Sequence, residues 1–220
     1  MGNRLHATND GLLATSEQHK WLDLIDWRRS IAALYDEVRN QPDPRHAHQL
    51  WRQGRDRLFR AHPQSPLTPD DQLREQGLPY WPYDPALRWT PPLEPVDEPR
   101  KLVLDTGTDG TTSFHQVGVI KLPSPFEAEL AVWWLEGYAG GLFLPIRDAT
   151  AGSTSYGGGR YLLDTAKGAD LGGTGHSLVI DLNFLYHPSC RYNSDWACPL
   201  PPAQNTVTLA IEAGEALTPR

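Results

Sequence analysis

The 220-residue sequence lacks several features that would place it in a common functional class. No apolar run approaches the length needed to span a bilayer, so we expect no membrane association. The first twenty residues contain no apolar signal core, which predicts a cytoplasmic protein without a secretion signal. The formal net charge is −7 and no basic stripe is present, so nucleic acid is not an expected partner.

Motifs of several enzyme and metal-binding classes are also absent. The sequence contains no GxSxG nucleophile elbow, HExxH helix or CxxC pair. Its two cysteines, Cys190 and Cys198, lie farther apart than the about two to four residues usual between zinc-binding thiolates. We therefore expect no metal and no cofactor, and two reduced thiols. A loop disulfide, or a metal site completed by His176 and His187, remains an alternative.

The first part of the sequence has the periodicity of two helices. Thr15 begins a capping box, and apolar residues then recur every three or four positions, which predicts a helix over about residues 16–39. Asp43-Pro44 suits the N-cap and first turn of a second helix, which ends before Pro63. Gly54 weakens this second helix by roughly 1 kcal/mol relative to alanine.

A proline-rich stretch follows, from Pro63 to Pro99, and it holds ten of the 20 prolines. Each proline inside a helix costs about 3 kcal/mol, so the stretch is predicted to be an extended strap with turns. The strap contains four aromatic residues: Tyr80, Trp81, Tyr83 and Trp89. We expect them to attach the strap to the body of the protein, with stacking on a ligand as the alternative.

From Lys101 onward the apolar residues alternate with period two. Segments of this kind, punctuated by turns such as Asp109-Gly110, predict about seven or eight short strands. No helix-length segment lies between them to make parallel crossovers. The fold class expected is therefore α+β, mainly β with N-terminal helices, around an antiparallel barrel-like or strongly curved sandwich core.

The sequence accordingly divides into four segments. We expect a disordered N-terminus (1–15), a helical lead (16–62), a proline-rich strap (63–100) and an antiparallel β domain (101–220). The helical lead and the strap are predicted to pack on the β domain as one unit.

The predicted strand over residues 177–186 carries polar side chains on one face. Alternation places Asp181 and Asn183 opposite its apolar residues, so they face either solvent or a polar cavity. The alternative is an Asp181 carboxylate that accepts hydrogen bonds from loop amides. A further apolar strand is predicted over residues 206–212.

Three consecutive glycines precede Arg160 in the segment 147–161. A phosphate-binding P-loop would need a lysine followed by serine or threonine, so a nucleotide loop is not expected. Arg160 suits a clamp on a carboxylate or phosphate group. The alternative is a buried ion pair with Asp148, Asp164 or Asp181.

Two linked blocks of sequence closely resemble a bacterial and archaeal family known as domain of unknown function 1684. They read RDATAGSTSYGGGRYL and LVIDLNFLYHPSCRYNSDWACPLPPAQNTVTLAIEAGE, and GLPYWPYDPALRW upstream is also similar. The similarity covers roughly residues 27–215, with His187 standing where the family usually has asparagine. The family is uncharacterised, so the resemblance implies a cytoplasmic β-rich domain without assigning an activity. It also implies that the motif residues gather around one feature: Asp148, Tyr156, Arg160, Tyr161, Asp181, Asn183, Tyr186, Cys190, Tyr192, Asn193, Cys198 and Asn205.

Three functional hypotheses follow. The first is a domain that binds a small polar or anionic molecule in a barrel-end pocket, lined by Tyr156, Arg160, Tyr161, Asp181, Asn183, Tyr186, Tyr192 and Asn193. The second is an enzyme of unknown reaction class, with Asp181 as general base and His187 or Cys190 as its partner. The third is a structural or protein-interaction module with Trp133, Trp134 and Tyr138 in an exposed patch. The other expectation for these tryptophans is burial under the N-terminal helices. The oligomeric state is not predicted.

Overall fold

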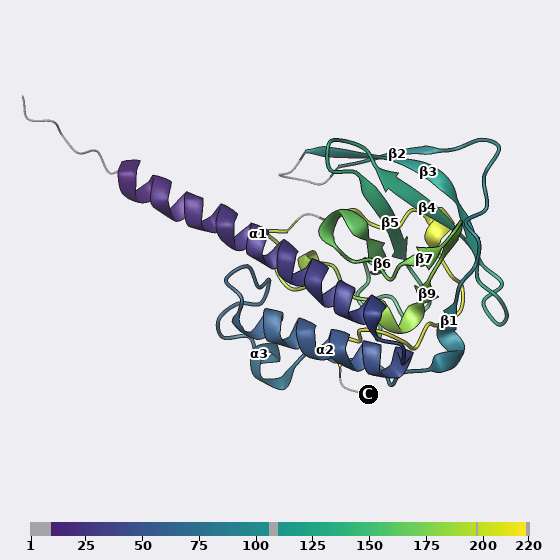
Figure 1. Ribbon diagram of the computed structural model, residues 1–220, viewed down its shortest axis with the longest axis horizontal. Helices are drawn as coiled ribbons and strands as arrows, with labels where there is room; N and C mark the ends of the chain where they lie inside the picture. The colour runs from purple at the N-terminus through teal and green to yellow at the C-terminus, as the bar shows by residue number, and fades with distance from the viewer. Residues whose placement is uncertain (1–9, 106–109, 197, 219–220) are drawn as a thin grey trace, which may run out of the picture.

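The computed structural model describes residues 10–105, 110–196 and 198–218. Figure 1 shows a β-rich body with two helices beside it, and the N-terminal part of the first helix projecting away from that body. Within these residues, no helix combines the length and the apolar character that crossing a membrane would require. Residues 1–9 of the predicted disordered N-terminus, and Asp109 of the predicted turn, lie outside the described residues.

Both predicted helices are present. Helix α1 spans Asp10–Asn40, so it begins before the predicted start near residue 16, and α2 spans Pro44–Ala61. The predicted cap of α2 is confirmed, because the carboxylate of Asp43 accepts a hydrogen bond from the amide of Arg45 at 3.0 Å.

Gly54 lies where the two helices pack together. A Cβ atom at this position would come within 2.4 Å of Cδ1 of Leu34. The absence of a side chain therefore permits the close approach of α1 and α2, and this contact offsets the low helix propensity of glycine.

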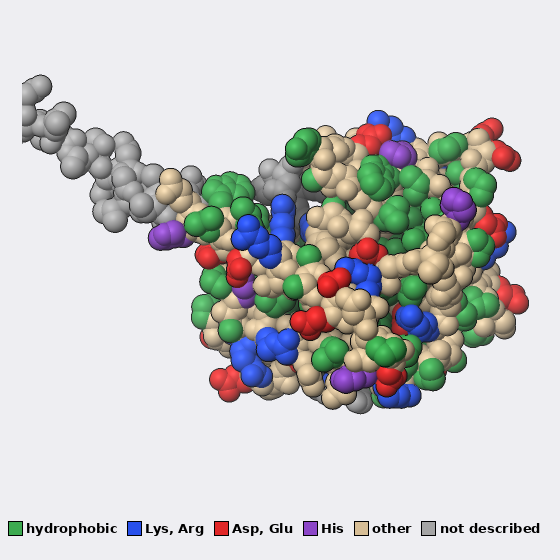
Figure 2. All heavy atoms as spheres, in the orientation of Figure 1, with side chains coloured by type: hydrophobic (Ala, Val, Ile, Leu, Met, Phe, Trp, Pro, Cys, Tyr) green, Lys and Arg blue, Asp and Glu red, His purple; other side chains and the backbone are tan. Residues whose placement is uncertain are grey.

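Residues 18–30 of α1 contribute little to the core. Trp21 and Leu22 are both 62% exposed, and among the α1 residues whose side chains are described (18–40) the buried apolar ones begin at Ile31. On the face shown in Figure 2, acidic and basic side chains are interspersed, and apolar side chains lie along the projecting helix.

The proline-rich strap contains three short elements: α3 (Leu73–Gln76), a 3-10 turn (Pro85–Leu87) and β1 (Arg88–Trp89). Tyr80 and Trp81 are buried. They attach the strap to the C-terminal segment, because Tyr80 forms a β-bridge with Glu215 and the amide of Trp81 donates to the carbonyl of Gly214 at 2.9 Å.

The main sheet has five antiparallel strands in chain order: β2 (Lys101–Asp105), β3 (Thr111–Lys121), β4 (Glu129–Leu135), β5 (Gly141–Ile146) and β6 (Arg160–Asp164). Two short pairs complete the set: β1 with β9 (Ile180–Asp181), and β7 (Gly173–Thr174) with β8 (Ser177–Leu178). The protein is therefore α+β with nine mostly antiparallel strands in its described part. The main sheet ends at β2 and β6 without closing into a barrel across these residues, so the barrel-like core stays a prediction.

Both faces of this sheet are buried. Leu130 and Val132 of β4 belong to the main core, which includes α1 and α2, whereas Ala131 and Trp133 belong to a second apolar cluster with Phe114, Phe143 and Tyr161. The expected burial of the tryptophans under the helices is therefore wrong. Trp133 is buried in the second cluster, and Trp134 is 38% exposed because it lies near the end of its strand.

Two predicted strands are confirmed only in part. The segment 177–186 is strand only as β8 and β9, and a 3-10 turn (Leu182–Phe184) follows because the side chain of Asp181 caps the amide of Asn183 at 3.1 Å. The segment 206–212 forms a single parallel bridge, from Thr206 to Arg147. Val207 and Leu209 form hydrogen bonds with the backbone of residues 147 and 149, whereas Ile211 bonds to two buried side chains described below.

Candidate functional site

The glycine run leads into a fully buried arginine. Arg160 has no exposed surface, and its Nη2 donates to Oδ2 of Asp148 at 2.8 Å. The guanidinium also donates to the carbonyls of Ile211 (2.8 Å), Glu215 (3.2 Å) and Ala213. Its Cζ atom lies 5.1 Å from the ring centre of Trp81. Arg160 is thus the buried partner of Asp148, and it is not among the residues that line the cavities described below.

The Asp148 carboxylate is held ionised in this setting. Burial raises its pKa, but the charge of Arg160 and hydrogen bonds from Thr150 outweigh burial, and the net pKa is lowered. Its Oδ1 also accepts from the amide of Ile211 at 3.1 Å. The pair therefore fixes the C-terminal segment in an irregular path, which explains the absence of the predicted strand.

A second buried ion pair joins α2 to the same segment. Nη2 of Arg55 donates to Oε2 of Glu215 at 2.7 Å, and Nε of Arg55 donates to the hydroxyl of Tyr80 at 3.1 Å. The Oε2 atom also accepts from the amide of His187 at 2.9 Å. Burial raises the pKa of Glu215, but the charge of Arg55 and the hydrogen bonds from His187 more than compensate and lower it. This carboxylate joins a helix, the strap and the cysteine-containing loop.

His187 has both ring nitrogens engaged. Its Nε2 accepts a hydrogen bond from the amide of Tyr156 at 3.1 Å, so we assign the proton of the neutral ring to Nδ1, which faces Oε1 of Glu215 at 3.4 Å. Burial lowers the pKa of this imidazole, which favours the neutral form. The lone pair that a general base would use is therefore occupied by a backbone amide.

Asp181 and Asn183 form a separate cluster. Oδ1 of Asp181 accepts from the amide and from Nδ2 of Asn183, at 3.1 and 2.8 Å. Oδ2 faces the hydroxyl of Tyr83 at 3.3 Å and Nη1 of Arg88 at 3.4 Å. Burial raises the pKa of Asp181, and the bonds from Asn183 and Arg88 oppose this shift. The amide-bonded alternative for Asp181 is thus what the structure contains.

Asn183 attaches the strap to this cluster. Its Oδ1 accepts from the amide of Asp84 and its Nδ2 donates to the carbonyl of the same residue, both at 2.8 Å. Tyr83 and Arg88 on either side of Asp84 are thereby held against Asp181. The strap thus supplies half of the cluster.

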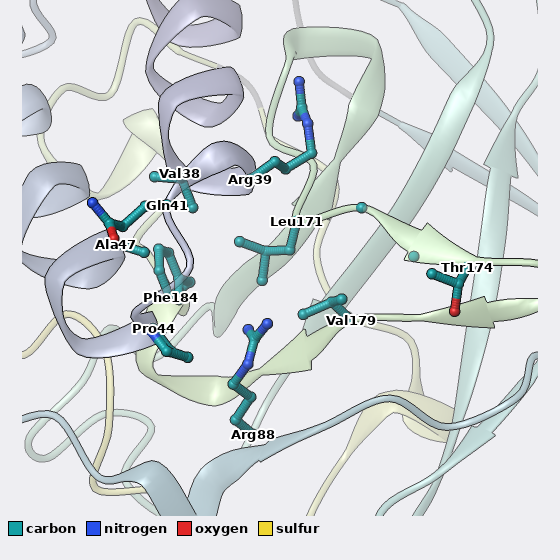
Figure 3. Close-up of a pocket in the computed structure, with 12 residues that line it drawn as sticks. Val38, Arg39, Gln41, Pro44, Ala47, Arg88, Leu171, Thr174, Val179 and Phe184 are labelled. Carbon is teal, nitrogen blue, oxygen red and sulfur yellow. The ribbon is translucent and has the colours of Figure 1, made fainter.

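A cavity of about 280 Å³ lies beside Arg88, between the α1–α2 turn and the β7–β8 hairpin. Figure 3 shows the side chain of Arg88 extending from β1 toward Leu171 and Val179, while the guanidinium of Arg39 is directed away. Arg39 is engaged by the carbonyl of Asp170 at 2.8 Å. Arg88 is therefore the cation that this cavity presents to a ligand. The complete lining is Val38, Arg39, Gln41, Pro44, Ala47, Arg88, Leu171, Gly172, Gly173, Thr174, Val179 and Phe184.

The predicted tyrosines have different surroundings. Tyr161 belongs to the second cluster, and its hydroxyl donates to the carbonyl of Pro199 at 2.6 Å. Tyr186 lies with its ring 5.0 Å from the guanidinium of Arg55. Tyr192 packs edge-on against Phe59, with 5.2 Å between ring centres. These three side chains pack the interior, and none of them lines the cavity beside Arg88.

The remaining predicted residues lie near the cysteine loop. The hydroxyl of Tyr156 is 4.0 Å from Sγ of Cys190, and Oδ1 of Asn193 accepts the amide of Asp195 at 2.8 Å within a turn. Both cysteines are free thiols in this structure. In the described part of the chain, no hydrogen bond or ion pair joins Asp181 to His187 or Cys190.

The expectation of one shared feature is confirmed only in part. A chain of contacts leads from Arg160 through Glu215 and His187 to Tyr156 and the cysteine loop, whereas Asp181 and Asn183 form a separate cluster. Arg88 was missed, although it lies in the block GLPYWPYDPALRW that carried part of the family resemblance. The family resemblance of that block was the sequence signal that could have identified Arg88 as a candidate.

Comparisons with known proteins agree with this resemblance. The model of a family described as "protein of unknown function (DUF1684)" matches residues 75–216. The solution NMR structure of an uncharacterized protein from Haloarcula marismortui is 32% identical in sequence, with a TM-score of 0.54. The match covers 76% of this chain and 91% of that one. No curated protein matches the chain.

Proposed function

The chain belongs to the protein family of unknown function DUF1684, and from this starting point we propose that it binds a small organic carboxylate in the cavity beside Arg88. The observation that carries the proposal is a guanidinium that is fixed on one side and open on the other. The side chain of Arg88 is 35% exposed, whereas its partner Asp181 is fully buried. The proposal keeps the small anionic ligand expected from the sequence, and it does not require the sheet to close into a barrel.

The guanidinium of Arg88 has N–H donors that are not used within the described part of the protein. A guanidinium carries five N–H donors, and among the described residues Arg88 donates a single hydrogen bond, to Asp181 at 3.4 Å. Asn183 and Tyr83 also donate to that carboxylate, so Asp181 does not depend on Arg88 alone. The outer edge of the guanidinium can then bind a carboxylate through two parallel hydrogen bonds.

The remainder of the cavity favours a short apolar body on the ligand. Its walls include Leu171, Val179, Phe184 and Val38, while Thr174 and Gln41 add neutral polar groups. The volume of about 280 Å³ is near the lower end of the roughly 300–1,000 Å³ typical of ligand pockets. A short-chain or single-ring carboxylate matches both the charge and the size.

The test is a titration of the isotope-labelled full chain with butyrate and benzoate, followed by NMR. We expect saturable shifts of the amide signals of Gly172, Gly173 and Thr174, and no such shifts with butyramide, which lacks the charge. Arg88→Met should weaken binding about 10- to 100-fold, since hydrogen bonds to charged groups contribute about 1.5–3 kcal/mol.

Arg57→Met is the matched control, because Arg57 is an exposed arginine of α2 that does not line the cavity. It should bind like the unaltered protein. Equal affinity for butyrate and butyramide, or unchanged affinity in Arg88→Met, would refute the proposal. Binding of inorganic phosphate in place of the carboxylates would contradict the assigned ligand class.

A further inference from the structure

The two cysteines meet in space although seven residues separate them. Cys190 lies in a 3-10 turn, Ser189–Arg191, and the following turns reverse the chain. As a result the amide of Cys190 donates a hydrogen bond to Sγ of Cys198 at 3.4 Å. Both side chains are partly exposed. The loop thus presents two adjacent thiols near the surface.

The surroundings make these thiols unequal. A hydrogen bond from the Cys190 side chain lowers the pKa of Cys198, and burial opposes this effect. The amide of Cys190 and the charge of Lys167 lower the pKa further, to about 7. The same hydrogen bond, together with burial, raises the pKa of Cys190. Cys198 is therefore the more acidic thiol of the pair.

A cavity lies next to this pair. Pro199, which follows Cys198 in the chain, lines a space of about 560 Å³ together with Lys167 and Asp164. Lys167 is 61% exposed and pairs with Asp164 at 3.3 Å, so its ammonium group lies at the surface. A small solute that enters this space approaches a positive charge and the neighbourhood of a thiolate.

We propose that Cys190 and Cys198 form a redox-active dithiol that is converted to an intramolecular disulfide by exchange with a small-molecule disulfide. Cys198 is the attacking thiolate and Cys190 the resolving thiol. This site is separate from the cavity beside Arg88, because none of its residues lines that cavity.

The exchange proceeds in two displacements. The thiolate of Cys198 attacks one sulfur of the small disulfide RSSR, so that a Cys198–SR bond forms, the S–S bond of RSSR breaks and one RS⁻ leaves. Cys190 then loses its proton to solvent and attacks the sulfur of Cys198, which releases a second RS⁻. Two electrons pass from the protein thiols to RSSR, and both RS⁻ groups are protonated to RSH.

The rate advantage of Cys198 can be calculated from its acidity. At pH 7 about half of a thiol with a pKa of about 7 is ionised, against about 1–3% of an ordinary cysteine. A less basic thiolate is also a weaker nucleophile: the logarithm of its rate constant falls by about 0.4–0.5 for each unit by which its pKa is lowered. The net expectation is a roughly three- to sixfold faster reaction.

The experiment incubates the full chain with oxidised glutathione at pH 7 and follows its intact mass. The unaltered protein should lose two hydrogen atoms and retain no glutathione, whereas Cys190→Ser should stop at the mixed disulfide on Cys198. The serine hydroxyl keeps a donor beside Cys198. The folded Cys190→Ser variant should therefore react roughly three to six times faster than the same variant unfolded in urea.

A second pair of variants tests the electrostatics without altering either thiol. Lys167→Met should raise the pH midpoint for alkylation of Cys198 by iodoacetamide. Lys121→Met should leave it unchanged, because Lys121 is also an exposed lysine in an ion pair, with Glu94, on another part of the surface. Persistent mixed disulfide in the unaltered protein, or equal rates in folded and unfolded Cys190→Ser, would overturn the proposal. So would identical midpoints for the two lysine variants.

Discussion

Replacing Asp148 with asparagine should strongly destabilise the fold, because it leaves the buried guanidinium of Arg160 without its counter-charge. Removing one partner of a buried ion pair costs about 3–5 kcal/mol. Three backbone carbonyls still accept hydrogen bonds from Arg160, so we expect the lower end of this range. A loss of about 3 kcal/mol in the free energy of unfolding corresponds to a roughly 6–12 °C decrease in Tm for a chain of this size.

The assay is urea-induced unfolding with an unchanged m-value, which shows that the two states compared remain the same. Glu94→Gln serves as the control, because it breaks the exposed pair with Lys121 and should cost less than about 1 kcal/mol. In a double-mutant cycle, Asp148→Asn and Arg160→Met should couple by about 1–3 kcal/mol. A cost below about 0.5 kcal/mol for Asp148→Asn, or simple additivity, would refute a structural role for this pair.

The pH dependence provides a further check on the same pair. The pKa of Asp148 in the folded state is lower than the usual 3.8, so the unfolded chain binds the proton more readily. The stabilisation is therefore fully present above about pH 4 and is lost as the pH falls through the folded-state pKa. The stabilities of the unaltered protein and Asp148→Asn should converge in strong acid.

Two more predictions concern the helices. Gly54→Ala should lower the free energy of unfolding by a net of up to about 2 kcal/mol, measured by urea unfolding. Overpacking against α1 costs about 1–3 kcal/mol, and the gain in helix propensity returns roughly 1 kcal/mol of this. A more stable variant would contradict this prediction. Burial, and after it the charge of Arg52, lowers the pKa of His48 from 6.5 to about 4 in the folded protein. As the pH falls below 6.5, the His48 imidazole is therefore protonated in the unfolded chain before it is protonated in the folded one. The unaltered protein should lose about 3 kcal/mol more than His48→Phe between pH 6.5 and 4 in urea titrations at each pH, and parallel losses would refute the assignment.

The helices and the five-stranded sheet could be predicted because local patterns determine them. The apolar spacing of α1 and the Asp43 cap both depend on residues close in sequence. The pairing of β2 with β3 likewise follows from alternation on both sides of a turn. The clear error among these elements is the start of α1, which lies before the predicted residue 16.

The irregular C-terminal segment could not be predicted from its own residues. Its apolar alternation is typical of a strand, but the carbonyls of Ile211, Ala213 and Glu215 bond to Arg160, about fifty residues earlier in the chain. A buried guanidinium without those acceptors would be very costly. The long-range polar requirement therefore outweighs the local preference for a strand.

The same reasoning explains why the candidate residues did not assemble into one site. Asp181 and Arg160 both read as ligand-binding groups, because sequence cannot show whether a buried polar residue is already satisfied by the protein. Both Nη atoms of Arg160 donate to Asp148 or to backbone carbonyls in the interior, whereas Arg88 donates one bond and remains partly exposed. Available hydrogen-bonding capacity at a cavity, rather than polarity alone, therefore distinguishes a binding residue from a structural one.

The strap connects folding of the protein to formation of the proposed site. Asn183 holds Asp84 through two hydrogen bonds, and this contact positions Arg88 on Asp181. If the strap were displaced, Asp181 would lose the donors of Tyr83 and Arg88 while remaining in the body of the protein. The cavity would lose its cation in the same step. Binding of a carboxylate at Arg88 should therefore stabilise the docked strap, because a ligand that binds only the folded arrangement shifts the equilibrium toward it.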